Sequence, residues 1–151
     1  MEADHHRALE RYLHQQIPLS AAMGVQVREA GINEVRLFAP LQPNINHHST
    51  VFGGSAAAIA TLSAWTLLHV RLMHIGSDAN LVIQRNAMNY ESPIPGDFDA
   101  VCAFSDVIAW DRFQALLARR GRARLTLQAH LIYQGATAAS FEGDFVALRT
   151  S

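Results

Sequence analysis

The chain has 151 residues, of which 50% are apolar and 17% are charged, and its formal net charge is −1. This length and composition suit one globular domain over residues 1–151 and exclude a disordered chain. The near-zero charge gives no reason to expect nucleic acid or an anionic membrane as a partner. A single cysteine, Cys102, excludes an internal disulfide and is typical of a cytoplasmic protein.

The first segment predicts a helix. Residues 1–18 carry acidic side chains early and lack a long apolar run, which excludes a signal peptide. Leu9, Tyr12, Leu13 and Ile17 are spaced as one face of a helix. We therefore expect residues 1–18 to form an N-terminal helix and its lead-in, lying on the body of the domain.

The rest of the chain alternates strand-like and helix-like patterns. Gly121 is a predicted helix C-cap, and Gly143 predicts a bulge in the last strand. The order predicts an α+β protein in which an antiparallel sheet of about six strands wraps around one long central helix. Long sheet edges would favour pairing in a homodimer. We expect strands at 25–30, 34–41, 80–91, 98–107, 122–133 and 136–149, a loop at 42–52, and helices at 53–73 and 110–121.

The expected central helix is unusually apolar. Residues 53–70 contain no charged side chain, and this length is near the minimum for a membrane span. However, the segment is mostly Ala, Ser, Thr and Gly, with His69 inside it and Arg71 directly after it. A helix that is apolar all round is one that is covered on all sides. We therefore expect a buried helix and no membrane.

The stretch "NINHHSTVFGGSAAAIATLSAW" (44–65) leads into this helix and raises the question of a ligand. Adjacent histidines such as His47 and His48 rarely bind one ion together, and no acidic residue lies between Val35 and Ser77, so we do not expect the three or four ligands of a zinc site. The Gly-Gly pair matches neither phosphate-loop pattern, and no basic residue follows until Arg71. We expect neither a metal site nor a phosphate loop.

The remaining interpretation of this stretch is a helix start that binds an oxygen atom. Gly53, Gly54 and Ser55 open the helix, where unpaired N–H groups carry about half a positive charge. Glycine lets a ligand approach the backbone closely, and such donors stabilise an oxygen that gains negative charge during a reaction. The alternative is that Gly-Gly only permits close packing on the sheet and that Ser55 is a simple cap.

The residues that precede and follow this helix start resemble a known family. Asn46 lies seven positions before Gly53, and the segments "IPLSAAMGVQV", "LFAPLQPNINHHSTVFGGS", "SAW", "NYESPIPGD" and "LIYQG" are similar to the YiiD C-terminal family of hotdog-fold thioester enzymes. The resemblance covers nearly the whole chain. It implies the hotdog fold, a homodimer or a tetramer, and an acyl thioester substrate on coenzyme A or acyl carrier protein, with no separate cofactor.

The sequence departs from the hydrolytic pattern of the hotdog enzymes. Hydrolases of this fold usually carry Asp or Glu about two turns into the central helix, whereas the matching position here is Thr61, with Ser63 nearby. No carboxylate lies between Glu34 and Asp78, although Glu91 could substitute. Hydrolysis needs a base to activate water. Decarboxylation of a malonyl thioester needs a stabilised enolate, and a nearby carboxylate would repel the substrate by about 4 kcal/mol at a separation of ~4 Å.

We therefore expect decarboxylation of malonyl-acyl carrier protein in fatty acid synthesis. The alternatives are an acyl-CoA or acyl-carrier-protein thioesterase and a non-catalytic binder of acyl thioesters. The cysteine at 102 and the histidines at 69 and 130 are expected to be structural. We expect the catalytic residues to be Asn46, Gly53, Gly54 and Ser55. We expect two substrate-binding residues at the pocket, Asn44 and Phe52. Three more, which would face phosphates or an acidic carrier protein, are Arg119, Arg120 and Arg122, with Arg124 nearby.

Overall fold

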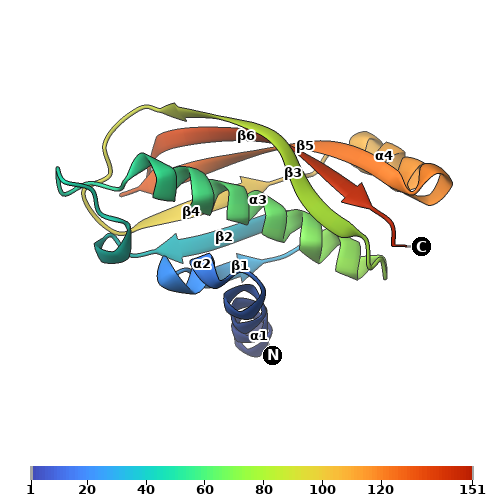
Figure 1. Ribbon diagram of the computed structural model, residues 1–151, viewed down its shortest axis with the longest axis horizontal. Helices are drawn as coiled ribbons and strands as arrows, with labels where there is room; N and C mark the ends of the chain where they lie inside the picture. The colour runs from blue at the N-terminus through green and yellow to red at the C-terminus, as the bar shows by residue number, and fades with distance from the viewer. Residues whose placement is uncertain (1, 151) are drawn as a thin grey trace.

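The computed structural model describes residues 2–150, which form one sheet and its covering helices (Figure 1). The predicted order of elements is confirmed, and most predicted bounds agree to within two residues. The helices are α1 (Glu2–Gln16), α2 (Pro18–Ala22), the short 3-10 helix η1 (Gln42–Asn44), α3 (Gly53–His74) and α4 (Val107–Arg120); the strands are β1 (Gln26–Ala30), β2 (Glu34–Ala39), β3 (Asn80–Tyr90), β4 (Phe98–Ala103), β5 (Arg122–Tyr133) and β6 (Ala136–Leu148).

The six strands form one antiparallel sheet in the order β1-β2-β4-β5-β6-β3. The 22-residue helix α3 crosses one face of the curved sheet and contacts every strand (Figure 1). This arrangement confirms the predicted α+β architecture of a sheet around a central helix. Because alternate residues of β5 are buried, the sheet turns one apolar face toward α3 and one polar face outward.

Helix α3 is long and apolar enough to cross a membrane, but 61% of that apolar window is buried inside the protein. Ile59, Leu67 and Leu68 are fully buried against the sheet. Burial on several sides explains why the helix lacks a polar stripe. The apolar run predicted as a core helix therefore forms one.

Helix α1 closes the first edge of the sheet. Its predicted apolar face is buried at Leu9 and Leu13, whereas Tyr12 remains 40% exposed. The Val27 N–H donates to Glu10 Oε1 at 2.8 Å, and His14 Nε2 lies 2.8 Å from the Val25 carbonyl oxygen. Side chains of α1 thus occupy backbone groups at the β1 end of the sheet, which would otherwise be unpaired.

Strand β3 forms the opposite edge and is open. It pairs only with β6 among the described residues, and all eleven of its residues are exposed or half-buried. Val82, Ile83 and Tyr90 are large apolar side chains exposed along it. A long strand edge with apolar side chains is a ready template for pairing with another strand.

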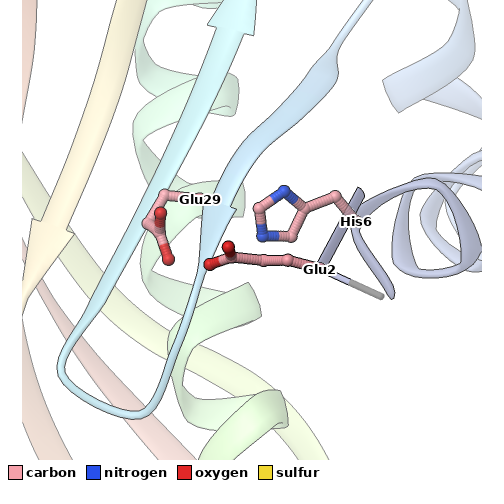
Figure 2. A group of neighbouring side chains, drawn as sticks. All are labelled: Glu2, His6 and Glu29. Carbon is pink, nitrogen blue, oxygen red and sulfur yellow. The ribbon is translucent and has the colours of Figure 1, made fainter. Parts of the chain in front are cut away.

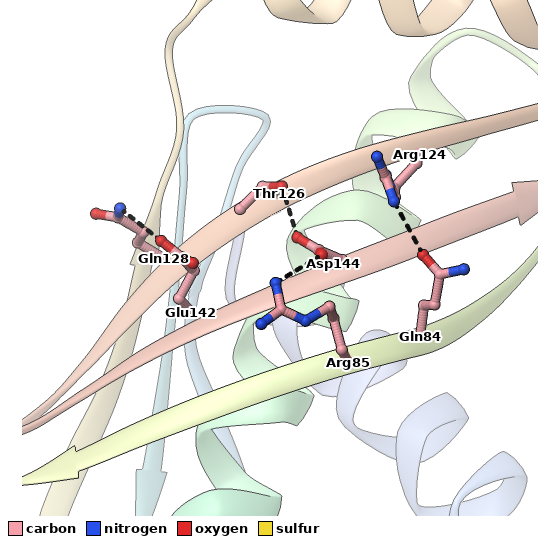
Figure 3. A network of polar contacts seen from close by, with 7 residues as sticks. All are labelled: Gln84, Arg85, Arg124, Thr126, Gln128, Glu142 and Asp144. Carbon is pink, nitrogen blue, oxygen red and sulfur yellow. Dashed lines mark hydrogen bonds and ion pairs between the residues drawn. The ribbon is translucent and has the colours of Figure 1, made fainter.

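The outer face of β3, β5 and β6 carries a polar network (Figure 3). Asp144 accepts a hydrogen bond of 2.6 Å from Thr126 Oγ1 and lies 3.5 Å from Arg85 Nη1. The Thr126 hydroxyl, with a smaller effect from Arg85, holds the pKa of Asp144 below its usual value. On the same face, Arg124 Nη1 donates to Gln84 Oε1 at 3.4 Å.

Two details differ from the sequence-based expectation, and one confirms it. The strand predicted at 98–107 ends at Ala103, because Asp106 caps α4 by accepting from Ala109 N at 3.0 Å. The predicted bulge at Gly143 is wrong: Gly143 pairs in register with β3 and β5, and a Cβ there would lie 2.6 Å from the Phe141 ring. The predicted cap at Gly121 is confirmed, with φ of 71°.

Two groups expected to be structural lie where they stabilise the fold. Cys102 is fully buried, and burial raises the pKa of its thiol to about 12. His69 lies between the rings of Tyr12 and Trp65, with both ring centroids 4.9 Å away. His130, by contrast, is exposed on β5.

Candidate functional site at the start of helix α3

The loop before α3 is held in place by a buried amide. The Asn44 Nδ2 donates to the carbonyl oxygens of Met23 at 2.9 Å and Pro40 at 2.8 Å. The Asn44 backbone carbonyl oxygen accepts from the Phe52 N–H at 2.8 Å. Asn44 therefore ties the end of β2 to the residue that precedes α3, and it does not line the cavity described below.

Asn46 organises the tip of the same loop. Its Oδ1 accepts from the backbone N–H groups of His48 at 2.8 Å and Thr50 at 3.1 Å, and its Nδ2 donates to Thr50 Oγ1 at 2.9 Å. This is an Asx-turn, in which an asparagine side chain replaces a backbone partner. In the single chain, the Asn46 carboxamide thus contacts its own loop.

The first turn of α3 has free backbone donors. No described residue accepts a hydrogen bond from the N–H groups of Gly53, Gly54 or Ser55, and Phe52 provides no side-chain cap. The Phe52 ring, which is 57% exposed, lies over Gly54, where a Cβ would be 2.4 Å from Phe52 Cε2. The helix start thus keeps three donors and the partial positive charge of the helix.

A cavity of about 330 Å³ opens beside Gly53. The Tyr90 hydroxyl donates to the Gly53 carbonyl oxygen at 3.1 Å and forms one wall. Glu91 follows in the same wall, and its Oε1 accepts from Ser140 Oγ at 3.4 Å. The remaining lining residues are Val51, Ala56, Ser92, Pro93, Ile94 and Ala139.

The middle of α3 carries no carboxylate, and the buried Thr66 Oγ1 is a hydroxyl there with no hydrogen-bond partner among the described residues. The other two hydroxyls, of Thr61 and Ser63, are engaged. Thr61 Oγ1 donates to the Ala57 carbonyl oxygen at 2.8 Å, and the buried Ser63 Oγ donates to the Ala60 carbonyl oxygen at 2.7 Å. Both hydroxyls therefore bond back to their own helix. The carboxylate at the cavity comes from Glu91, at the end of β3.

The predicted site residues therefore separate into three groups. Gly53 lines the cavity, with Gly54 and Ser55 in the same helical turn. The residues at positions 44, 46 and 52 shape the loop and the helix start. Arg119, Arg120 and Arg122 are exposed at the junction of α4 and β5, away from the cavity.

Sequence reasoning missed Tyr90 and considered Glu91 only as a substitute acid. Tyr90 ends the long strand β3 and Glu91 follows it, and only the curvature of β3 over α3 brings them to the helix start (Figure 1). Their signal in the sequence is their position at the end of a strand, directly before "SPIPGD". No periodicity argument assigns them to the helix start.

A second group of polar side chains lies elsewhere. Glu2 and His6 of α1 and Glu29 of β1 point toward one another, with candidate ligand atoms within 4.8 Å (Figure 2). Carboxylates gather in this way on many protein surfaces without an ion. Nothing else at this position indicates a ligand.

Comparison with known proteins identifies relatives of this architecture. A family model described as "Putative thioesterase (yiiD_Cterm)" matches residues 6–149. A protein of unknown function from Chlorobaculum tepidum TLS is 25% identical, with a TM-score of 0.91 over 99% of this chain and 97% of that chain. A "putative thioesterase" from Shewanella oneidensis is 26% identical, with a TM-score of 0.84 over 95% of this chain and 96% of that one.

Proposed function

This chain belongs to the family described as "Putative thioesterase (yiiD_Cterm)", and we propose that its reaction is the decarboxylation of malonyl-acyl carrier protein to acetyl-acyl carrier protein. The family and the hotdog fold support acyl-thioester hydrolysis at the coarse level. The finer proposal is carried by one observation: free N–H donors open a helix that has no carboxylate.

The chemistry needs only what the helix start provides. The bond between the malonyl Cα and its carboxylate carbon breaks, carbon dioxide leaves, and the electron pair moves into the thioester as an enolate. The N–H groups of Gly53 and Gly54 donate to the enolate oxygen, which stabilises charge as it develops. A proton from solvent then reaches Cα and completes the acetyl group. No nucleophile and no added cofactor take part.

A second reaction, hydrolysis, is favoured by Glu91. This carboxylate lines the same cavity as Gly53, so it could activate water beside a bound thioester carbonyl. For the same reason, Glu91 would repel a malonyl carboxylate unless its exposed side chain turns toward solvent. Glu91 is thus the residue on which the two reactions depend in opposite ways.

Mass spectrometry of malonyl-carrier protein incubated with the pure chain tests the proposal. Loss of carbon dioxide with the thioester intact is the expected result. Release of free carrier thiol would support hydrolysis instead. An unchanged mass across malonyl, acetyl and longer acyl groups would overturn both reactions and leave a non-catalytic binder of acyl thioesters.

The variant Glu91→Gln separates the two reactions at one residue. If Glu91 is the base, we expect hydrolysis to fall by about 10²–10⁴-fold. If the reaction is decarboxylation, the rate should hold or rise, because a negative charge has left the cavity. Glu142→Gln is the matched control, since Glu142 lies on the outer face and interacts with Gln128 (Figure 3).

We further propose that the protein works as a cytoplasmic homodimer joined through β3. The first edge of the sheet is occupied by α1, whereas β3 leaves its backbone groups and three apolar side chains exposed. A second copy fits because antiparallel pairing of two identical strands is self-complementary. Sedimentation of the pure chain should give a dimer; a monomer at micromolar concentration would contradict this.

A further inference from the structure

We propose that Asn44 is a positioning residue of the site: its buried carboxamide holds the start of α3 against the turn between α2 and β1, and so sets where the free N–H donors lie. Asn44 does not line the cavity, so it acts through the backbone that carries those donors. This inference rests on the proposed function, in which the donors bind the thioester oxygen.

Three segments of the chain meet at Asn44, which is only 1% exposed. Its Nδ2 donates to the carbonyl oxygens of Met23, directly after α2, and of Pro40, directly after β2, so both amide hydrogens are used. The Asn44 backbone carbonyl oxygen accepts from the N–H of Phe52, directly before α3. One residue thus links the α2–β1 turn and the end of β2 to the helix start.

The start of α3 depends on contacts of this kind. Phe52 occupies the N-cap position, and its side chain makes no capping hydrogen bond. Its carbonyl oxygen accepts the first helical hydrogen bond, from the Ala56 N–H at 2.9 Å, so a displacement of Phe52 moves the first turn with it. Tyr90 holds the next residue, through the Gly53 carbonyl oxygen. Asn44 and Tyr90 therefore fix two adjacent residues of the helix start from two different elements.

The α2–β1 turn is itself packed closely against the residues that bond Asn44. Gly24 has φ of 71°, and a Cβ there would lie 2.8 Å from Pro40 Cγ and 3.5 Å from Pro43 Cγ. This close approach leaves Pro40 little room to move, so its carbonyl oxygen is a fixed acceptor for Asn44. The contacts form a continuous path from Gly24 through Pro40 and Asn44 to the residue that begins the helix.

The Asn44 side chain also carries a penalty that stability alone does not explain. Its Oδ1 is buried and accepts no hydrogen bond from any described residue. A buried acceptor without a donor destabilises a fold, and such a group calls for a reason beyond packing. Positioning gives that reason, because a misplacement of about 1 Å at a reacting group can lower a rate by ~10²-fold.

The variant Asn44→Asp tests the role in turnover. It keeps the shape of the side chain but replaces an amide with two donors by a carboxyl with at most one. We expect kcat to fall about tenfold or more and KM to change less than about twofold, because the donors act on charge that develops in the transition state. Gln42→Glu is the control, since it adds the same charge at an exposed position of the same 3-10 helix.

Two kinetic results would contradict the inference. The first is a parental kcat in folded Asn44→Asp, which would show that the two amide donors do not matter for the reaction. The second is an equal loss in Gln42→Glu, which would attribute the effect to charge. Circular dichroism confirms that each variant is folded before rates are compared.

Amide hydrogen exchange tests the helix start without any turnover. The N–H groups of Phe52, bonded to Asn44, and of Ala56, in the first helical bond, report on the start, and Leu68 reports on the middle of α3. In Asn44→Asp, protection should fall about tenfold or more at Phe52 and Ala56 and hold at Leu68, because the opening is local. An equal fall at all three would mean that Asn44 only stabilises the whole fold, and unchanged protection at Phe52 would sever the proposed link; either result refutes the inference.

A pair of glycine variants acts on the same path from its far end and serves if Asn44→Asp does not fold. Gly24 and Gly76 have φ of 71° and 72°, so alanine is equally strained at both. At Gly24 the new Cβ meets Pro40, whereas at Gly76 nothing lies within 4 Å. We expect Gly24→Ala to lower kcat about threefold or more and to reduce protection at Ala56, and Gly76→Ala to leave both as in the parent. Equal behaviour of the two variants would exclude the path through Pro40.

These results can be separated from the outcome for the proposed reaction. The comparison of kcat and KM applies equally to decarboxylation of malonyl-carrier protein and to hydrolysis of an acyl thioester. If no thioester is turned over, the proposed function fails alone, and hydrogen exchange still decides whether Asn44 holds the helix start.

Discussion

The Tyr90 hydroxyl donates a hydrogen bond to the Gly53 carbonyl oxygen at 3.1 Å and so joins the end of the edge strand to the first turn of the central helix. The two residues are far apart in the sequence and share one wall of the cavity. This contact positions the strand end over the free N–H donors of α3. Because this hydrogen bond is exposed, its contribution to stability should be small. Its larger effect should be on the position of the strand end at the site.

Tyr90→Phe tests this contact. Loss of one exposed hydrogen bond should lower the free energy of unfolding by about 0.5–1 kcal/mol. We expect kcat/KM for the thioester to fall about threefold to tenfold, because the strand end is less well positioned over the helix start. Steady-state kinetics and thermal melting measure the two effects. Tyr133→Phe is the control, and equal kinetics for Tyr90→Phe and the parent would show that the contact has no role in the reaction.

Asn46→Ala tests whether the asparagine only organises its loop. Three hydrogen bonds to the loop are lost, at about 0.5–1.5 kcal/mol each. We expect kcat to fall at least tenfold and the melting temperature to drop by several degrees. Thr50→Val is the comparison, because it removes only the partner of Asn46 Nδ2.

The loss of activity relative to the loss of stability in the two variants distinguishes the two roles. If Asn46 acts only through the loop, both variants should lose activity in proportion to their loss of stability. If the carboxamide turns to the substrate, Asn46→Ala should lose far more activity than its stability explains. Near-parental activity of Asn46→Ala would remove Asn46 from the site.

Gly54→Ala tests the packing of Phe52 on the helix start. A Cβ at position 54 would lie 2.4 Å from Phe52 Cε2, so the ring must move. In the parent we expect the substitution to be neutral or destabilising. In a Phe52→Ala background the clash is gone, and alanine should stabilise the helix by about 0.5–1 kcal/mol relative to glycine. Denaturant unfolding of the four chains measures this coupling; additive effects would show that the ring does not restrict position 54.

His69 predicts a loss of stability in acid. Burial lowers the pKa of this imidazole below its ordinary value of 6.5, so the unfolded chain binds the proton more readily than the folded one. Stability should therefore fall as the pH decreases through 6.5 toward the folded-state pKa, and it should level off above 6.5. His69→Gln should reduce the slope of melting temperature against pH between 5 and 7. An unchanged slope would assign the dependence to another group.

The helix and the sheet could be predicted because their signals are local. Residues 53–70 are apolar all round, and Leu125, Leu127, Ala129 and Leu131 alternate as one buried face. These patterns predicted α3 and β5 with nearly correct ends. The helix after β4 was placed three residues late, because Asp106 was not recognised as its cap.

The site was only partly predictable, because it combines residues from separate elements. The Gly53-Gly54 start was found from its glycines and from the resemblance. Tyr90 carries no comparable local signal, since its place depends on how β3 curves over α3. The engagement of Asn46 with Thr50 could not be read from residue types, because an asparagine in such a loop serves a turn or a ligand equally well.

The side chains of Glu10 and His14 have a consequence for assembly. A sheet with two open edges can add copies without end, and such growth produces fibrils. This sheet has one edge blocked by its own first helix, so each chain offers a single place for strand addition. Under the proposed pairing through β3, strand addition would therefore stop at two chains, and we expect removal of α1 to open the second edge to further addition.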